Sequence, residues 1–305
     1  MAAHPGAEAL NIATGGVSQK LTPRRQAGAP RRKSLLMSVA KHSVALFFVV
    51  VFLSPFVFVV LTALMTQQQA LSSRLWPDPF QWSNFAEVFK AVPFWLYTYN
   101  TVFYAVLATI GVVLSSVPVA YALARMRWRG RQATFLIVLA TMMLPAQVTI
   151  VPLFVVFSRI HWVGSFKPLI VPAFFGDAFS IFLLRQFFLT IPEELIDAAR
   201  VDGASEFQIM WHVVVKLAKP AIMAVALFQF LYCWNDFFGP LIWSGSNTHI
   251  YTLSVGLTQF TSTHGGIVWN LQMAASLLFM LPVIVLFLFS QKVFIEGVTL
   301  TGVKG

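Results

Sequence analysis

Six long apolar runs constrain this chain more than any other feature of its sequence. Each run has 21 to 25 residues, and a helix needs about 20 apolar residues to cross a hydrocarbon core of about 30 Å. Only 10% of the residues are charged, against about 25% in soluble domains, so an ordinary soluble enzyme is excluded. The runs predict an all-α integral membrane protein whose six transmembrane helices lie at residues 42–65, 101–124, 133–157, 168–190, 220–243 and 271–291.

The distribution of positive charge predicts the orientation of these helices. Of the 21 Lys and Arg residues, 16 fall in segments 1–41, 125–132, 191–219 and 292–305, and four fall in the segments between them. Because cytoplasmic loops carry an excess of Lys and Arg, both termini are predicted to be cytoplasmic. Topology therefore explains the net charge of +10. Membrane lipid is an expected partner, and nucleic acid is not.

The first 41 residues differ in texture from the rest. They are rich in Ala, Gly, Pro and Arg without a periodic apolar pattern, a composition typical of disordered segments. We therefore predict a disordered basic cytoplasmic tail at 1–41 and a transmembrane domain at 42–305. The first apolar run is longer than the apolar region of a signal peptide, so it is interpreted as a retained anchor.

No catalytic or metal site is recognisable in the sequence. The six histidines are dispersed, Cys233 is the single cysteine, and the HExxH, GxSxG and phosphate-loop patterns are absent. We therefore predict no catalytic residue, no metal and no cofactor in this chain. If the chain moves a solute uphill, the energy must come from an ion gradient or from another subunit.

The cytoplasmic segment 191–219 breaks the apolar pattern and holds five of the eleven acidic residues. It predicts two short helices, the first at residues 192–202, separated by Gly203. Small residues on the first helix would let another surface approach closely. That helix is either a connector lying on the membrane surface or a docking element for a cytoplasmic partner.

Two capping boxes support these helix starts. Thr190 with Glu193 fits the pattern in which a hydroxyl and a carboxylate exchange hydrogen bonds with the first backbone N–H groups, and Ser205 with Gln208 fits it again. The second helix is expected to run from Ser205 through Trp211 toward the membrane.

The same segment resembles the EAA loop of ABC importer permeases. That loop reads Glu-Ala-Ala, three residues, Gly, nine residues, Ile-x-Leu-Pro. This chain has Asp197-Ala-Ala-Arg-Val-Asp-Gly203, then nine residues and Val213-Val-Val215. The chain departs from the pattern at Asp197, where the family has Glu, and at Lys216, where the family has Pro. The second departure bears on how the following helix bends.

Five further stretches resemble the carbohydrate-uptake subfamily of these permeases, the type to which the smaller permease of the maltose transporter belongs. They lie in the expected order at residues 120–125, 143–152, 182–188, 234–241 and 296–305. The resemblance covers the whole chain after the tail. It implies the six-helix type I importer permease fold in a bacterial-type cytoplasmic (inner) membrane.

In that family two homologous permeases form the pathway, an ABC ATPase dimer sits beneath them, and an extracytoplasmic solute-binding protein delivers sugar. The resemblance implies that this chain is one permease, with ATP and Mg bound by the partner ATPase. It assigns ATPase coupling to Glu193, Glu194, Asp197, Ala198, Ala199, Asp202 and Gly203, and a C-terminal ATPase contact to Thr301, Gly302 and Lys304.

Polar residues inside the runs are costly in a bilayer and so suggest function. Asp177 falls near the middle of the fourth run, and three neighbours fall in the outer half of the fifth: Trp234, Asn235 and Asp236. All four are candidates for the solute path. Asp236 could instead pair with the partner permease or lie in interfacial water, and Asp177 could be a proton-relay group or face a vestibule.

Two other polar residues in the runs are expected to be structural. Arg185 is expected to extend to cytoplasmic headgroups. Asn100 is expected to cap the second transmembrane helix.

The preferred function is the permease subunit of an ATP-driven importer. A neutral mono- or oligosaccharide is the preferred solute, since the exterior loop 244–270 lacks Lys and Arg, and glycerol phosphate is the alternative. The rival function is a stand-alone ion-coupled carrier that uses Asp177 and Asp236, and a third is a membrane-embedded enzyme or scaffold. The loop at 192–203 discriminates among them, because a self-sufficient carrier needs no ATPase dock.

Overall fold

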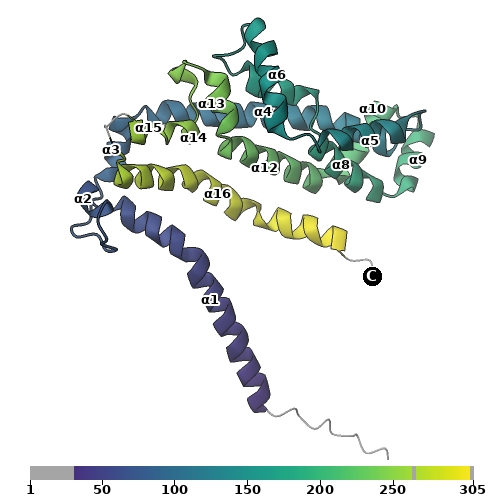
Figure 1. The fold of residues 1–305 in the computed structure, drawn as a ribbon. Coiled ribbons are helices and arrows are strands. Elements are labelled where there is room, and N and C mark those ends of the chain that lie inside the picture. Colours follow the sequence, from purple (N-terminus) through teal and green to yellow (C-terminus); the bar gives the residue numbers. More distant parts are fainter. Residues whose placement is uncertain (1–30, 263–265, 303–305) are drawn as a thin grey trace, which may run out of the picture. The chain divides into compact units, whose positions relative to one another are not determined.

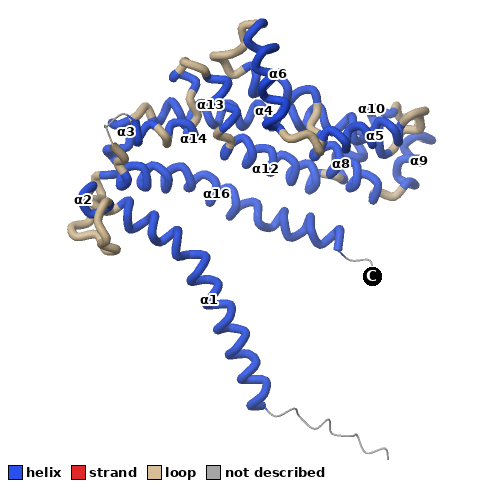
Figure 2. The backbone as a smooth tube through the Cα atoms, viewed as in Figure 1, coloured by secondary structure: helices blue, strands red, loops and turns tan. Residues whose placement is uncertain are grey.

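The computed structural model describes residues 31–262 and 266–302, and every regular element in that part of the chain is helical (Figures 1 and 2). The predicted all-α class is therefore confirmed. The chain divides inside its first helix into two units, residues 1–54 and 55–305.

The described helices comprise longer helices and short helical turns. The longer ones are α1 (Arg31–Ala63), α3 (Asn84–Ala91), α4 (Phe94–Ala124), α5 (Arg131–Thr141), α6 (Ala146–Arg159), α8 (Ala178–Thr190), α9 (Glu193–Val201), α12 (Lys219–Asn235), α13 (Phe238–Ser244) and α16 (Trp269–Gly302). The short ones are α2 (Gln67–Ala70), α7 (Lys167–Ile170), η1 (Val171–Phe175), α10 (Glu206–Ile209), η2 (Met210–Val214), α11 (Val215–Leu217), η3 (Thr248–Ile250), α14 (Leu253–Gly256) and α15 (Gln259–Ser262).

Four helical segments of the described chain are long and apolar enough to cross a membrane: Met37–Ala63, Phe94–Ala124, Lys167–Thr190 and Trp269–Gln291. They correspond to the first, second, fourth and sixth predicted spans. A fifth crossing is formed if α12 is counted with Glu206–Leu217, from which it is bent by 80°. The third predicted span is divided into α5 and α6, each shorter than a crossing requires.

Proline explains where two predicted spans break. The proline ring clashes with the carbonyl four residues earlier. Pro145 precedes α6, and α5 ends four residues before it, at Thr141. Pro240 lies in the first turn of α13, and the residue four positions earlier, Asp236, directly follows the last residue of α12.

The first helix begins earlier than the sequence indicated. Helix α1 starts at Arg31, so the disordered tail predicted for 1–41 does not extend to residue 41. Ser34 to Ala40 include Leu, Met and Ala, which favour helix, and so carry α1 beyond its apolar run. Residues 1–30 lie outside the described residues.

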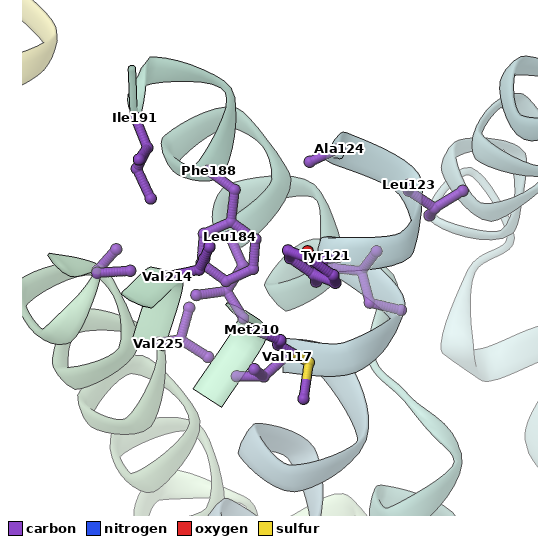
Figure 3. Packing of buried hydrophobic residues seen from close by; sticks show 14 of the residues in the cluster. Val117, Tyr121, Leu123, Ala124, Leu184, Phe188, Ile191, Met210, Val214 and Val225 are labelled. Carbon is purple, nitrogen blue, oxygen red and sulfur yellow. The ribbon is translucent and has the colours of Figure 1, made fainter. Parts of the chain in front are cut away.

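Helix α4 is the central element of the second unit, with α8, α12 and η1 packed along it. One core cluster joins its C-terminal part to α8, to α12 and to the loop around α9, through residues such as Tyr121, Phe188, Met210, Val214 and Val225 (Figure 3). Gly111 permits the contact with η1, because a Cβ there would lie 2.7 Å from the Phe174 ring.

A second cluster lies at the opposite end of α4 and joins it to α3, α14 and α16. A buried amide pair links three helices there. Asn84 of α3 donates to the carbonyls of Ala63 and Met65 at the end of α1, each at 2.8 Å. Asn270 of α16 donates to the side-chain oxygen of Asn84 at 3.2 Å.

Two structural expectations were wrong. Asn100 does not cap a helix: α4 begins six residues earlier, and the buried Asn100 amide donates to the carbonyls of His249 and Tyr251 at 2.7 and 2.9 Å. Arg185 does not extend away from the bundle: its Nε donates to the Leu123 carbonyl at 3.1 Å, and its guanidinium lies 3.9 Å from the centre of the Phe135 ring. In both cases a side chain satisfies carbonyls at a helix end.

Candidate functional site

The loop predicted to hold two short helices has them. Helix α9 covers Glu193–Val201 and α10 begins at Glu206 after a turn. The Ser205 and Gln208 capping box is confirmed, since both of its hydrogen bonds are present. The Thr190 and Glu193 box is wrong: the Thr190 hydroxyl donates to the Phe187 carbonyl in its own helix, and Pro192 precedes α9 without a side-chain cap.

Gly203 makes the turn between the two helices. Its φ is +80°, in the left-handed region where a Cβ costs about 1–2 kcal/mol. Nothing lies within 4 Å of the position a Cβ would take. Glycine is therefore required here by backbone conformation and not by a close neighbour.

The carboxylate of Glu206 fastens the loop to the membrane helices. It accepts a 2.5 Å hydrogen bond from the Tyr121 hydroxyl of α4 and a 2.9 Å bond from Arg200 Nε of α9. Arg200 also contacts Asp197 within α9 at 2.9 Å. The hydrogen bond to Glu206 is the largest cause of a raised pKa for Arg200. One acid thus joins α4, α9 and α10.

Arg125, at the C-terminal end of α4, makes the second link to this loop. Its guanidinium donates to the carbonyl of Phe188 through Nε at 2.9 Å and Nη2 at 2.5 Å, and to the carbonyl of Ile191. These carbonyls lie where α8 ends and have no continuing helix to bond. The start of α9 is therefore held by the end of α4.

Helix α9 is buried on one face and exposed on the other. Ile196 is 1% exposed and packs into the core cluster of Figure 3. Glu193, Glu194, Asp197 and Ala198 are exposed, Ala199 is half-buried, and Asp202 and Gly203 of the following turn are exposed. Large apolar side chains are exposed as well: Leu195 at 45%, Val201 at 87% and Phe207 at 71%. The residues predicted to couple to an ATPase thus form an accessible surface on a fixed element.

A second site is a cavity of about 720 Å³ that contains both carboxylates predicted to lie on the solute path. Asp177 is at the N-cap of α8 and accepts from the backbone N–H and the hydroxyl of Ser180, at 2.8 and 2.6 Å. Asp236 is the C-cap of α12 and accepts from the Tyr104 hydroxyl and the Gly239 N–H, each at 3.0 Å.

The other polar residues that line this cavity were not predicted from the sequence. Tyr104, Gln229 and Tyr232 line it together with aromatic residues that include Phe179 and Trp243. Tyr104 and Tyr232 lie within the apolar helices α4 and α12 and belong to no sequence motif, so only the three-dimensional arrangement singles them out. The cavity combines hydroxyl, amide and carboxylate groups with aromatic faces.

Two of the four predicted path residues do not line the cavity. Trp234 is 1% exposed, stacks between Phe230 and Phe279, and donates from Nε1 to the Phe279 carbonyl at 3.3 Å. It is a core residue. Asn235 is exposed and donates to the Leu231 carbonyl of its own helix at 2.8 Å.

The remaining predictions concern the C-terminus and metals. Thr301 and Gly302 are the last residues of α16, and Lys304 lies outside the described residues. The ATPase contact assigned to them stays a prediction. Among described residues, no group of three or more His, Cys, Asp or Glu side chains is arranged to hold a metal ion.

Comparison with known families decides the class of this chain. Residues 116–299 match the family described as "Binding-protein-dependent transport system inner membrane component", which is more than half of the sequence. The chain belongs to this family. It is therefore a permease subunit of an ABC transporter, a class in which ATP hydrolysis belongs to a separate subunit.

Two relatives and one solved structure extend this result. An arabinooligosaccharide transport system permease protein, AraQ of Halalkalibacterium halodurans, is 34% identical over 75% of this chain and 81% of its own length. The sn-glycerol-3-phosphate permease UgpE of Yersinia pestis is 33% identical, over 72% and 80%. A crystal structure of a bacterial ABC transporter involved in alginate import has a TM-score of 0.75 at 25% identity, covering 86% and 97%.

Replacing Tyr121 with Phe should loosen the loop that carries α9. The change removes a hydrogen bond to a charged acceptor, which is worth about 1.5–3 kcal/mol. We expect amide hydrogen exchange in α9 and α10 to be about tenfold faster or more. Asp197→Asn is the matched control, because it removes only an exposed ion pair worth less than about 1 kcal/mol. Equal exchange in the Tyr121→Phe variant and the unmodified protein would refute the role given to this bond.

Proposed function

We propose that this chain is one of two permeases in an ATP-driven importer, and that it carries a neutral mono- or oligosaccharide into the cytoplasm. The observation that carries the proposal is the loop at 193–203, which is anchored to the membrane helices on one side and accessible on the other. An element that transmits movement must be rigid at its attachment and free at its contact surface. This loop meets both conditions.

The proposed partners follow from the chemistry of that loop. Helix α9 docks into an ABC ATPase dimer that binds ATP and Mg, and closure of the dimer pulls on α9. The pull reaches α4 through Glu206 and Tyr121, and it reaches the end of α8 through Arg125. A two-state change of this kind needs an interface that both states share. A homologous permease and an extracytoplasmic solute-binding protein complete the system.

The proposed topology is six crossings with both termini in the cytoplasm of a bacterial-type inner membrane. It rests on the excess of Lys and Arg in segment 125–132 and in segment 191–219. The structure supports this topology because the two segments are in contact: the guanidinium of Arg127 lies 3.2 Å from the carboxylate of Glu193. The third crossing is then made by α5 and α6 together, broken before Pro145.

The preference for a neutral sugar rests on the cavity. Its described lining holds two carboxylates, Asp177 and Asp236, and no Lys, Arg or His. A strongly anionic solute would meet like charge there without a cation to offset it. Hydroxyls, an amide and aromatic faces suit sugar hydroxyls and ring surfaces. The relatives are named for an arabinooligosaccharide and for glycerol 3-phosphate, and the cavity favours the first kind of solute.

The rival function, an ion-coupled carrier, has weaker support. Its two candidate carboxylates are each engaged at a helix end: Asp177 caps α8 and Asp236 accepts from the first turn of α13. Protonation of a capping carboxylate weakens the helix that it caps. Such a carboxylate therefore suits a structural role better than repeated proton transfer. In an ion-coupled carrier, the accessible surface of α9 would also have no function.

Replacing Gly203 with Arg should abolish ATP-driven uptake while leaving membrane insertion intact. The positive φ strains any side chain there, and the arginine would project into the ATPase contact. Gly164→Arg is the matched control, since Gly164 has a φ of +85° and equally open surroundings but lies outside the loop. Uptake would be measured with a labelled sugar in vesicles that contain ATP. Equal loss in both variants would attribute the effect to backbone strain and contradict the docking role.

Replacing Asp236 with Asn should make the cavity more tolerant of anionic solutes. The change removes one negative charge that would lie several ångströms from an anionic solute. The uptake of glycerol 3-phosphate relative to a neutral arabino-oligosaccharide should therefore rise about tenfold. Glu87→Gln, an exposed change on α3 outside the cavity, should leave that ratio unchanged. An unchanged ratio in the Asp236→Asn variant would show that the solute does not pass this cavity.

A further inference from the structure

A second cavity, of about 660 Å³, lies beside the start of α9 and has no part in the proposed transport path. It is formed by the connection between α4 and α5, together with Leu189 near the end of α8 and Glu193 at the start of α9. Three arginines line it: Arg125, Arg127 and Arg131. This concentration of positive charge in one hollow is the observation that calls for a ligand.

The arginines retain unused hydrogen-bonding capacity. A guanidinium has five N–H donors. Arg131 donates from Nη1 to the Met126 carbonyl at 3.1 Å, and Arg127 contacts one carboxylate oxygen of Glu193 at 3.2 Å, in an exposed pair. Arg125 is committed to backbone carbonyls and supplies charge. Glu193 is the single acid among the lining residues, so the hollow keeps a net positive charge.

The surroundings of the cavity are those of a membrane boundary. It begins where the long apolar helix α4 ends, at Arg125. Trp128 lines it and is 41% exposed, and tryptophan prefers the level of the lipid headgroups. The exposed apolar side chains of the adjoining helices include Leu136 and Ile137 of α5 and Leu189 of α8. Positive charge and apolar surface therefore meet at one place.

We propose that this cavity binds the headgroup of an anionic phospholipid, with the acyl chains lying against α5 and the end of α8. Basic hollows at the cytoplasmic ends of transmembrane helices suit phosphate headgroups, and planar guanidinium groups bind phosphate oxygens in pairs. A phospholipid satisfies both the charge and the exposed apolar side chains, whereas a free phosphate satisfies only the charge. Because the headgroup would share Arg127 with Glu193, the lipid contacts the start of the helix assigned to ATPase coupling.

The test is lipid retention by the intact transporter, measured by native mass spectrometry after purification from membranes containing phosphatidylglycerol and phosphatidylcholine. The unmodified protein should retain phosphatidylglycerol preferentially. Each arginine near an anionic surface contributes about fivefold, so the double variant Arg127→Gln/Arg131→Gln should bind it about thirtyfold more weakly. Arg129→Gln is the matched control: it removes the same charge from the same connection, but Arg129 is exposed and does not line the cavity.

Three results would overturn the proposal. In the first, the double variant retains as much phosphatidylglycerol as the unmodified protein. In the second, Arg129→Gln weakens retention as much, for each charge removed, as the double variant does, which would reduce the effect to general surface charge. Displacement of the lipid by millimolar inorganic phosphate would assign the cavity to a soluble anion. Sugar uptake is measured on the same preparations, so that failure of the lipid proposal is separable from failure of the transport function.

Discussion

In a hydrocarbon environment every backbone N–H and C=O must find a partner inside the protein, and this chain meets that requirement with side chains placed at helix ends. Arg125 and Arg185 donate to carbonyls where α8 and α4 end. Asn84 does so at the end of α1. Asp177 and Asp236 accept N–H groups where α8 and α13 begin. Polar residues within and beside the apolar runs are therefore the means by which broken helices are tolerated.

This role has a mechanical consequence for transport. Helix ends fixed by side chains of a neighbouring helix move with that neighbour. Glu206 joins α9 and α10 to α4, and Arg125 joins α4 to the end of α8. A displacement imposed on α9 is thus delivered to the two helices whose residues Tyr104 and Asp177 line the polar cavity. The proposed coupling loop and the proposed solute path are connected through side-chain contacts that the structure displays.

The sequence predicted the parts of this structure that depend on local patterns. The length of the apolar runs predicted helices, and Ser205 with Gln208 predicted the start of α10 because a capping box involves four consecutive residues. The Thr190 and Glu193 box is equally local and still failed, because the Thr190 hydroxyl bonds within its own helix. In other cases the deciding contact lies far away in the sequence. Asn100 bonds carbonyls about 150 positions away, and Trp234 stacks on Phe279, so neither role is visible in the local sequence. Pro145 and Pro240 were visible, but whether a proline breaks or only bends a helix depends on the neighbours that satisfy the freed groups.

The central claim is that this chain works as one subunit of an ATP-driven assembly and receives its energy through α9. Its most direct test is gentle affinity purification of the chain from its native membrane, with mass spectrometry of the bound proteins and an ATPase assay on the eluate. We expect an ABC ATPase, a second permease and a solute-binding protein, with ATP hydrolysis in the purified material. Recovery of the chain alone, able to move a solute into liposomes without ATP, would contradict this account.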